Sequence, residues 1–197
     1  PDQKTLRLSF PVDFPNGKEN VLQVFGVKDQ SGNEMPAVEK TFLFFQPVKA
    51  SYKDVVVTEI LADPTPTIGL PDAEYVELFN RSEHPFDLGG WILTDGSSSA
   101  ILPSRILLPD AYLILTTASS ASSFTAHGHV SGLANFPTLN NAGDLVVVKN
   151  EEGITVDSVH YSDSWYVDQD KRAGGWSMEL IDPENICGEQ NNWSVSE

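Results

Sequence analysis

The sequence predicts an all-β protein, because short runs rich in Val, Ile, Tyr and Thr recur between clusters of Gly, Pro, Asn and Asp. No stretch places apolar residues at positions i, i+3, i+4 and i+7 over the length that a helix needs. A chain of 197 residues with 40% hydrophobic side chains is also long enough to bury a core. These three observations together predict a β-sandwich.

A change in composition divides the chain near residue 50. Residues 1–48 hold six acidic and five basic side chains, net −1, whereas residues 49–197 hold 22 acidic and seven basic side chains, net −15. All four tryptophans also lie in the second part, and residues 46–51 (QPVKAS) resemble a short connector. We therefore expect one domain over residues 1–48 and another over residues 52–197.

The first part predicts three strands, at Thr5–Phe10, Val21–Val27 and Thr41–Phe45, joined by turns at 15–17 and 29–33. Three strands are too few for an isolated sandwich. They could pack on the second domain, pair with another chain to form an oligomer, or close a domain whose earlier strands precede the segment. We favour the last alternative, a truncated domain.

The second part predicts seven clear strands and two weaker ones. The clear ones are Val55–Ile60, Glu74–Asn80, Gly90–Thr94, Ala111–Thr117, Asp144–Lys149, Ile154–Tyr161 and Ser177–Ile181, and the weaker ones are Ala100–Leu102 and Arg105–Leu108.

Alternation along these runs indicates which faces are buried. In the run 74–80, Val76 and Leu78 share one face, the period of a strand packed on one side. In the run 154–161 the alternation slips, which predicts a β-bulge near Asp157-Ser158.

Six motifs in a fixed order carry a family resemblance. The motifs are VTEI (57–60), EYVELFN (74–80), LGGWIL (88–93), YLIL (112–115), LNNAGD (139–144) and VDSVHY (156–161). In this order and spacing they resemble the lamin tail domain family, whose fold is an immunoglobulin-like β-sandwich. The run GGWSMELIDP (174–183) resembles the bacterial, exported branch of that family. The run VFGVKD (24–29) resembles the last strands of a bacterial surface immunoglobulin-like repeat, so residues 1–48 are expected to be an immunoglobulin-like remnant.

The resemblance implies a non-catalytic interaction or structural module of a larger secreted or cell-surface protein, with an extracellular, cell-surface or periplasmic location. Nuclear lamin tails have been associated with DNA, but a net charge of −15 in the second part repels phosphate backbones. We therefore expect no nucleic-acid partner. No apolar run approaches the roughly 20 residues of a membrane-spanning helix, so we expect no membrane insertion.

An alternative function is calcium-dependent binding of a glycan or another polymer. The acidic residues Glu59, Asp63, Asp72, Glu74 and Glu77 flank a connection between two strands that are expected to pair, and carboxylate oxygens are the ligands that calcium prefers. The other interpretation, which we favour, is that Glu59 and Glu77 are solvated or accept hydrogen bonds from turn amides, and that Asp63-Pro64 starts a turn.

Two aromatic residues, Trp165 and Tyr166, lie in a polar loop with Asp163, Asp168 and Asp170. Their amphipathic rings are suited to contact a glycan or a protein partner. Packing at the end of the sandwich is an equal alternative for Trp165. The loop acids have the same two interpretations as the first acidic cluster, calcium ligands or solvated side chains.

The sequence carries no recognisable catalytic motif, so we expect neither an enzyme nor a bound organic cofactor. Asp157, Ser158 and His160 lie too close together on one strand to form a triad by themselves, and the nucleophile-elbow and phosphate-loop patterns do not occur. Cys187 has no cationic neighbour within three residues, which predicts an inert, buried or half-buried thiol.

Overall fold

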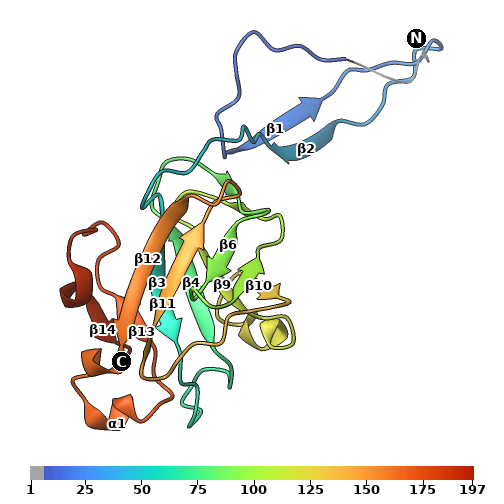
Figure 1. The fold of residues 1–197 in the computed structure, drawn as a ribbon. Coiled ribbons are helices and arrows are strands. Elements are labelled where there is room, and N and C mark those ends of the chain that lie inside the picture. The colour runs from blue at the N-terminus through green and yellow to red at the C-terminus, as the bar shows by residue number, and fades with distance from the viewer. Residues whose placement is uncertain (1–6) are drawn as a thin grey trace. The chain divides into compact units, whose positions relative to one another are not determined.

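The computed structural model describes residues 7–197. Its contacts divide into two compact units that meet at the bond between Gln46 and Pro47. Almost all regular structure is β, and among the described residues only α1 (Gln169–Arg172) is an α-helix (Figure 1). The all-β fold class is thus confirmed.

The described part of the first unit, residues 7–46, contains one β-hairpin. Strands β1 (Glu19–Val24) and β2 (Val38–Leu43) pair antiparallel along their whole length. The prediction of a strand at Thr5–Phe10 was wrong where it can be checked, because residues 7–10 form no strand, and residues 5 and 6 lie outside the described residues. Pro11, directly after this run, has no N–H to donate to a strand ladder.

The other two predicted strands of this unit are present but begin earlier in the chain. Asn16 sets the end of the hairpin, since its side chain both donates to the carbonyl of Gln46 at 3.0 Å and accepts from the N–H of Gln46 at 2.7 Å. Phe14 packs edge-on against Phe42, with ring centroids 5.1 Å apart.

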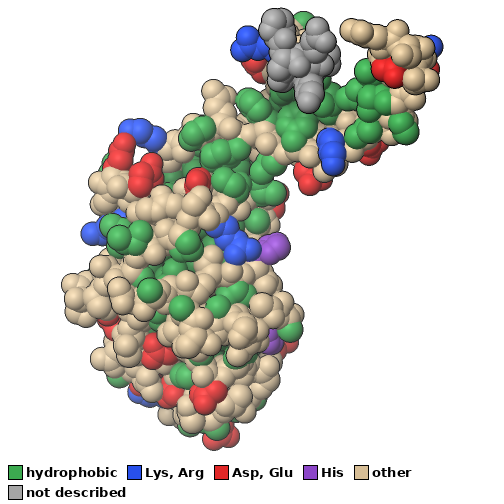
Figure 2. Space-filling view, turned by 90° about the vertical axis from the view of Figure 1, so that its right-hand side faces the viewer, with side chains coloured by type: hydrophobic (Ala, Val, Ile, Leu, Met, Phe, Trp, Pro, Cys, Tyr) green, Lys and Arg blue, Asp and Glu red, His purple; other side chains and the backbone are tan. Residues whose placement is uncertain are grey.

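Apolar side chains lie on the outside of this first unit, where Figure 2 shows them as a green cluster. Val21, Phe25, Val27, Val38 and Leu43 are all exposed. A two-stranded ribbon of this kind buries too little apolar surface to be stable by itself. That residues 1–48 complete a truncated immunoglobulin-like domain remains a prediction.

The second unit contains twelve strands and three 3₁₀ helices. The strands are β3 (Val55–Leu61), β4 (Tyr75–Asn80), β5 (Phe86–Asp87), β6 (Ile92–Thr94), β7 (Ser99–Ile101), β8 (Ile106–Leu107), β9 (Tyr112–Thr117), β10 (Val130–Leu133), β11 (Gly143–Lys149), β12 (Thr155–Ser162), β13 (Met178–Leu180) and β14 (Trp193–Val195), and the 3₁₀ helices are η1 (Ala121–Phe124), η2 (Asp163–Trp165) and η3 (Glu189–Asn192).

These strands form the two sheets of a sandwich, as predicted. One sheet has the order β10-β9-β4-β3-β13-β14 and the other β12-β11-β6-β7, while β5 and β8 form a small separate ribbon. Neighbouring strands are antiparallel except β9 and β10, which run parallel. The sequence did not predict β5, β10 or β14 as strands. In β10, Gly132 interrupts the run of strand-forming side chains that would have indicated a strand. A glycine is needed there because an added Cβ would lie 2.8 Å from the Cα of Ala118.

The core lies between the two sheets. Val76 and Leu78 of β4 face it from one sheet, as the alternation predicted, and Val146 and Val148 of β11 face it from the other. Trp91 fills the centre and is 1% exposed. Each such fully buried side chain contributes roughly 1.5–3 kcal/mol to folding.

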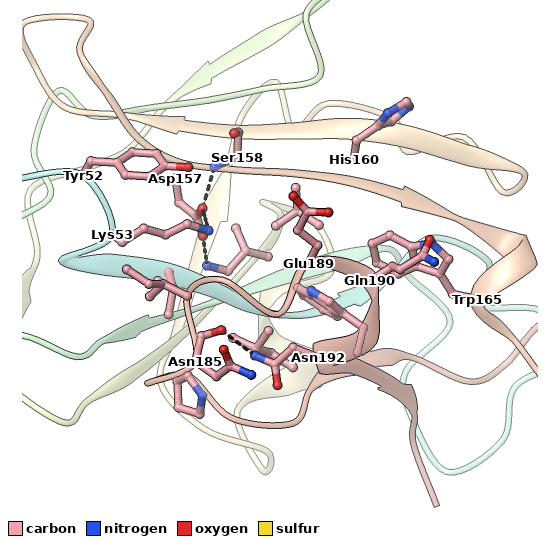
Figure 3. Close-up of a pocket in the computed structure, with 17 residues that line it drawn as sticks. Tyr52, Lys53, Asp157, Ser158, His160, Trp165, Asn185, Glu189, Gln190 and Asn192 are labelled. Carbon is pink, nitrogen blue, oxygen red and sulfur yellow. Dashed lines mark hydrogen bonds and ion pairs between the residues drawn. The ribbon is translucent and has the colours of Figure 1, made fainter.

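One side of the sandwich is left incompletely closed. Strand β13 pairs with only Glu59 and Ile60 of β3, so the first half of β3 has no neighbour on that edge. Strand β12 ends the four-stranded sheet and also has a free edge. The two uncovered edges approach each other, and residues 181–192 pass over the opening (Figure 3).

Candidate functional site

A groove of about 440 Å³ lies at this opening between β3, β12 and the C-terminal segment 181–192. Its size lies within the range of ligand sites in proteins. Lys53, Asp157 and Glu189 project into it, whereas the side chain of His160 points away, so the part of β12 at His160 presents its main chain to the groove (Figure 3).

A buried ion pair forms the floor of the groove. The ammonium of Lys53 lies 2.5 Å from Oδ1 of Asp157, and the two side chains are 16% and 1% exposed. A buried carboxylate is costly unless it is paired and hydrogen-bonded. Asp157 meets both conditions, because its Oδ2 accepts from the N–H of Val57 at 2.7 Å and its Oδ1 from the N–H of Ser158 at 2.6 Å.

The local sequence explains how Asp157 reaches this position. The pairing of β11 with β12 shifts register between Val148 and Lys149, which leaves Val156 as an extra residue in β12. This irregularity lies one residue before the predicted bulge. It lets both Val156 and Val159 face the core while Asp157 turns toward β3.

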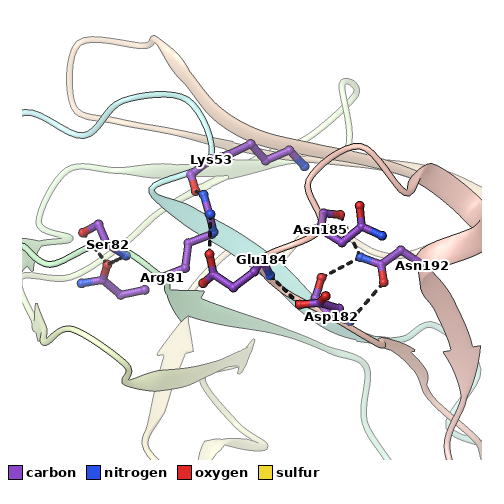
Figure 4. Close-up of polar contacts among 8 residues, drawn as sticks. Lys53, Arg81, Ser82, Asp182, Glu184, Asn185 and Asn192 are labelled. Atoms are coloured by element: carbon purple, nitrogen blue, oxygen red, sulfur yellow. Dashed lines mark hydrogen bonds and ion pairs between the residues drawn. The ribbon is translucent and has the colours of Figure 1, made fainter.

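A polar network fixes the far wall of the groove (Figure 4). Arg81 donates to the carbonyl of Lys53 at 3.2 Å and pairs with Glu184 at 2.6 Å. The buried amide of Asn192 donates to the carbonyls of Asp182 at 2.7 Å and of Asn185 at 3.0 Å. The segment 181–192 is therefore held by side chains.

Of the two predicted partner contacts, one lines the groove and the other is buried. Trp165 is half-buried against the core and its ring lies 5.9 Å from that of Trp193, so packing and partial exposure are both present. Tyr166 is 8% exposed and donates its hydroxyl to the carbonyl of Trp176 at 2.7 Å. Burial raises the pKa of Tyr166 to about 12.

The five candidate calcium ligands do not share one site. Glu59 and Glu77 lie opposite each other on β3 and β4, where Glu59 accepts from the hydroxyl of Tyr75 and Glu77 from that of Thr58 at 2.9 Å. Strand β13 adds Glu179 opposite Glu59. Burial first, then the neighbouring Glu59 and Glu179, raise the pKa of Glu77 to about 7, although the hydrogen bond from Thr58 acts the other way.

The remaining three candidates bond to the turns around them. Oδ1 of Asp63 accepts from the N–H of Thr65 at 3.3 Å, and Asp72 accepts from the hydroxyl of the same threonine at 3.4 Å. Glu74 accepts from the N–H of Leu139 at 3.0 Å, and burial raises its pKa. Asp63 and Glu74 thus accept from main-chain N–H groups and Asp72 from a hydroxyl, and calcium binding by these side chains remains a prediction.

The second acidic loop is likewise engaged. Asp163 accepts two hydrogen bonds from Arg172, at 3.0 and 2.6 Å, and Asp168 caps α1 by accepting from the N–H of Asp170. Within residues 7–197, no three His, Cys, Asp or Glu side chains are grouped in a way that could hold a metal ion. The geometry therefore gives no support to a calcium site.

Asp157, Ser158 and His160 lie next to one another on β12, but the side chains of Asp157 and His160 do not point toward each other (Figure 3). Both oxygens of Asp157 are occupied by Lys53, Val57 and Ser158, and His160 points to the opposite side of β12 (Figure 3). Cys187 is exposed, contrary to the prediction of a buried or half-buried thiol, because it lies in the surface segment 181–192.

Sequence reasoning missed most of the groove. Lys53 and Asp157 are far apart in the chain, and neither lies in a motif that predicts a binding site. One feature of the sequence pointed to Asp157. It lies where the alternation of apolar and polar residues along the strand is interrupted, and an acidic residue there has to be either solvated or paired with a cation.

Comparison with known families places the second unit. The model of the Lamin Tail Domain family matches residues 49–163, more than half of the chain. Comparison with curated proteins gives no match. No helix of the described residues has the length and apolar character to cross a membrane. Strands β13 and β14 and most of the far wall of the groove lie after the matched residues. The match, the two-sheet sandwich and the order of the motifs agree, and the chain belongs to the lamin tail domain family.

Proposed function

We propose that this chain is a non-catalytic interaction module of a larger secreted or cell-surface protein, and that the groove is its binding surface. The lamin tail domain is a family of immunoglobulin-like, non-enzymatic modules. One observation carries the proposal. The groove has half-buried aromatic rings and polar side chains at its wall, while its buried charges, Lys53 and Asp157, neutralise each other. Such a surface is suited to recognition.

The proposed location rests on the resemblance of residues 174–183 to the exported branch of the family. The first unit, in this proposal, is the closing part of a neighbouring immunoglobulin-like domain. Its exposed apolar face would then be covered by the rest of that domain. Pairing with a second chain is the alternative.

The test uses the purified 197-residue chain against an array of oligosaccharides and an array of extended peptides. Trp165→Ala removes a ring from the groove, and Tyr112→Ala removes an exposed ring from β9, outside the groove. The proposal expects at least one ligand whose binding weakens about tenfold with Trp165→Ala and stays unchanged with Tyr112→Ala. Binding affected only by Tyr112→Ala, no binding at all, or chemical turnover of a ligand would contradict it.

A further inference from the structure

The free edge of β12 has hydrogen-bonding groups that are not used within the sheet. Strand β12 pairs with β11 on one edge only. On its other edge, the carbonyl of Val156 accepts from the N–H of Lys53 at 2.7 Å, and the N–H of Ser158 donates to Asp157 at 2.6 Å. Because main-chain groups alternate along a strand, His160 presents its N–H and C=O to this same edge.

This part of the edge is open to the groove. Within residues 7–197, no main-chain hydrogen bond joins His160 to a residue outside the four-stranded sheet. Ser158, Val159 and His160 line the groove. Val159 packs in the core, and the side chains of Ser158 and His160 leave the space beside the main chain free (Figure 3). The start of the edge is closed by Lys53, and the strand ends at Ser162, so three or four residues of an added chain fit between.

The free main-chain N–H and C=O groups of β12 determine which kind of ligand can bind at this edge. A donor and acceptors that repeat every second residue, about 7 Å apart, match the main chain of an extended polypeptide. Across the groove, Leu180, Ile186 and Trp193 form an apolar wall that can receive one side chain of such a segment. A sugar ring has no such repeat of donors and acceptors.

The charges in and around the groove also favour one kind of ligand side chain. Lys53 is neutralised by Asp157, so it leaves no net charge in the groove. Glu189 is exposed, projects into the groove and has no ion-pair partner among the described residues (Figure 3). The surrounding residues 49–197 carry a net charge of −15. A positively charged side chain is favoured here by both the local and the overall field.

We infer that the free edge of β12 binds an extended segment of a partner protein as an added β-strand, with a lysine or arginine of that segment paired to Glu189. This inference rests on the proposed function, since it specifies what the groove recognises. The main-chain bonds to His160 provide affinity, while Glu189 and the apolar wall provide selectivity.

The test uses the full chain and a fluorescein-labelled octapeptide of alternating Lys and Val, with binding followed by fluorescence anisotropy. Two further peptides are N-methylated, one on all Lys amides and one on all Val amides. An added strand turns only alternate amides toward β12, so one methylated peptide should bind at least about tenfold more weakly while the other binds like the parent. Equal binding of both would show attraction by charge alone and overturn the inference.

Protein variants check the same edge from the other side. His160→Pro removes the outward N–H without removing a bond from the ladder with β11, so the sheet should tolerate it. We expect about tenfold weaker binding of the parent peptide, whereas His160→Thr, which keeps the N–H, should bind as the wild type does. Glu189→Lys should weaken binding about tenfold, and an octapeptide of alternating Glu and Val should bind poorly to the wild type. Unchanged binding in His160→Pro or Glu189→Lys would overturn the inference.

A third arm separates this inference from the proposed function. Chitohexaose is titrated into the same protein. Binding of the sugar but not the peptide, with loss in Trp165→Ala, would overturn the added-strand inference and leave the groove as an interaction site. If neither probe binds, and neither array of ligands shows binding that depends on Trp165, both proposals fail.

Discussion

The two units of this chain use the same antiparallel pairing with opposite results. The hairpin of β1 and β2 has alternating side chains and a complete ladder, yet Val21 is 56% and Val38 37% exposed. The strands of the sandwich place residues such as Val76 and Leu78 between two sheets, where both are 0% exposed. Strand pairing alone therefore does not create stability. A second apolar layer does, and among the described residues 7–197 such a layer is found in the sandwich and not in the hairpin.

The largest expected effect comes from the buried ion pair. Asp157→Ala leaves the ammonium of Lys53 and the N–H of Val57 without their partner, and should lower the free energy of unfolding by about 3–5 kcal/mol. The matched variant in the hairpin is Asp29→Ala, at an exposed acid that also accepts main-chain bonds, and it should leave the main unfolding transition unchanged. Urea unfolding measures both, and similar losses would contradict the comparison.

The next largest expected difference between the two units is the loss of stability when an apolar side chain is truncated. Leu78→Ala removes a fully buried side chain and should cost about 2–5 kcal/mol, while Val21→Ala in the hairpin should stay within about 0.5 kcal/mol. Thermal and urea unfolding of the two variants provide the test. An equal cost at Val21 would mean that the hairpin face is covered in solution.

Two glycines provide a third comparison. Gly174 has φ +107°, and an added Cβ would lie 2.0 Å from the carbonyl oxygen of Thr65. Gly32 in the hairpin turn has φ +83° with no atom within 4 Å. Gly174→Ala should therefore cost about 2–4 kcal/mol, from strain and overpacking together, and Gly32→Ala only about 1 kcal/mol of strain. Urea unfolding measures both losses. Nearly equal unfolding midpoints for the two variants would contradict the close approach of Gly174 to the carbonyl oxygen of Thr65.

Glu77 of the sandwich and Asp29 of the hairpin should contribute to the pH dependence of stability with opposite signs. The pKa of Glu77 rises on folding from 4.5 to about 7, so its contribution is present below pH 4.5 and is lost as the pH rises through 7. Glu77→Gln should flatten the dependence between pH 5 and 8. In the hairpin, hydrogen bonding from Asn33 lowers the pKa of Asp29, so its contribution is instead lost in acid. An unchanged slope in Glu77→Gln would contradict this assignment.

The smallest expected effect is that of calcium. The five candidate carboxylates are divided between a sheet face and a loop, and they accept hydrogen bonds from residues including Tyr75, Thr58 and Leu139. We expect the melting temperature to be the same in millimolar calcium and in chelator. A rise with calcium would reveal a site that binds the native state.

Patterns within single strands could be predicted, and associations between distant strands could not. The alternation of Val76 and Leu78 predicted their burial, because the side-chain period of a strand is a local property. The groove depends on where β13 leaves β3 and on a Lys53–Asp157 contact between distant parts of the chain. No local pattern contains that information. The family resemblance supplied the sandwich, but the far wall of the groove lies mostly after the matched residues.

Residue-resolved hydrogen exchange of the full chain tests the central claim most directly, namely that the sandwich is the stable unit and that β12 is an open edge of it. Val159, opposite Val146 in the ladder, should exchange only through global unfolding. The adjacent His160 should exchange at least about 100-fold faster, and so should the amides of β1 and β2. Protection of His160 equal to that of Val159, or a hairpin as slow as the core strands, would contradict the account.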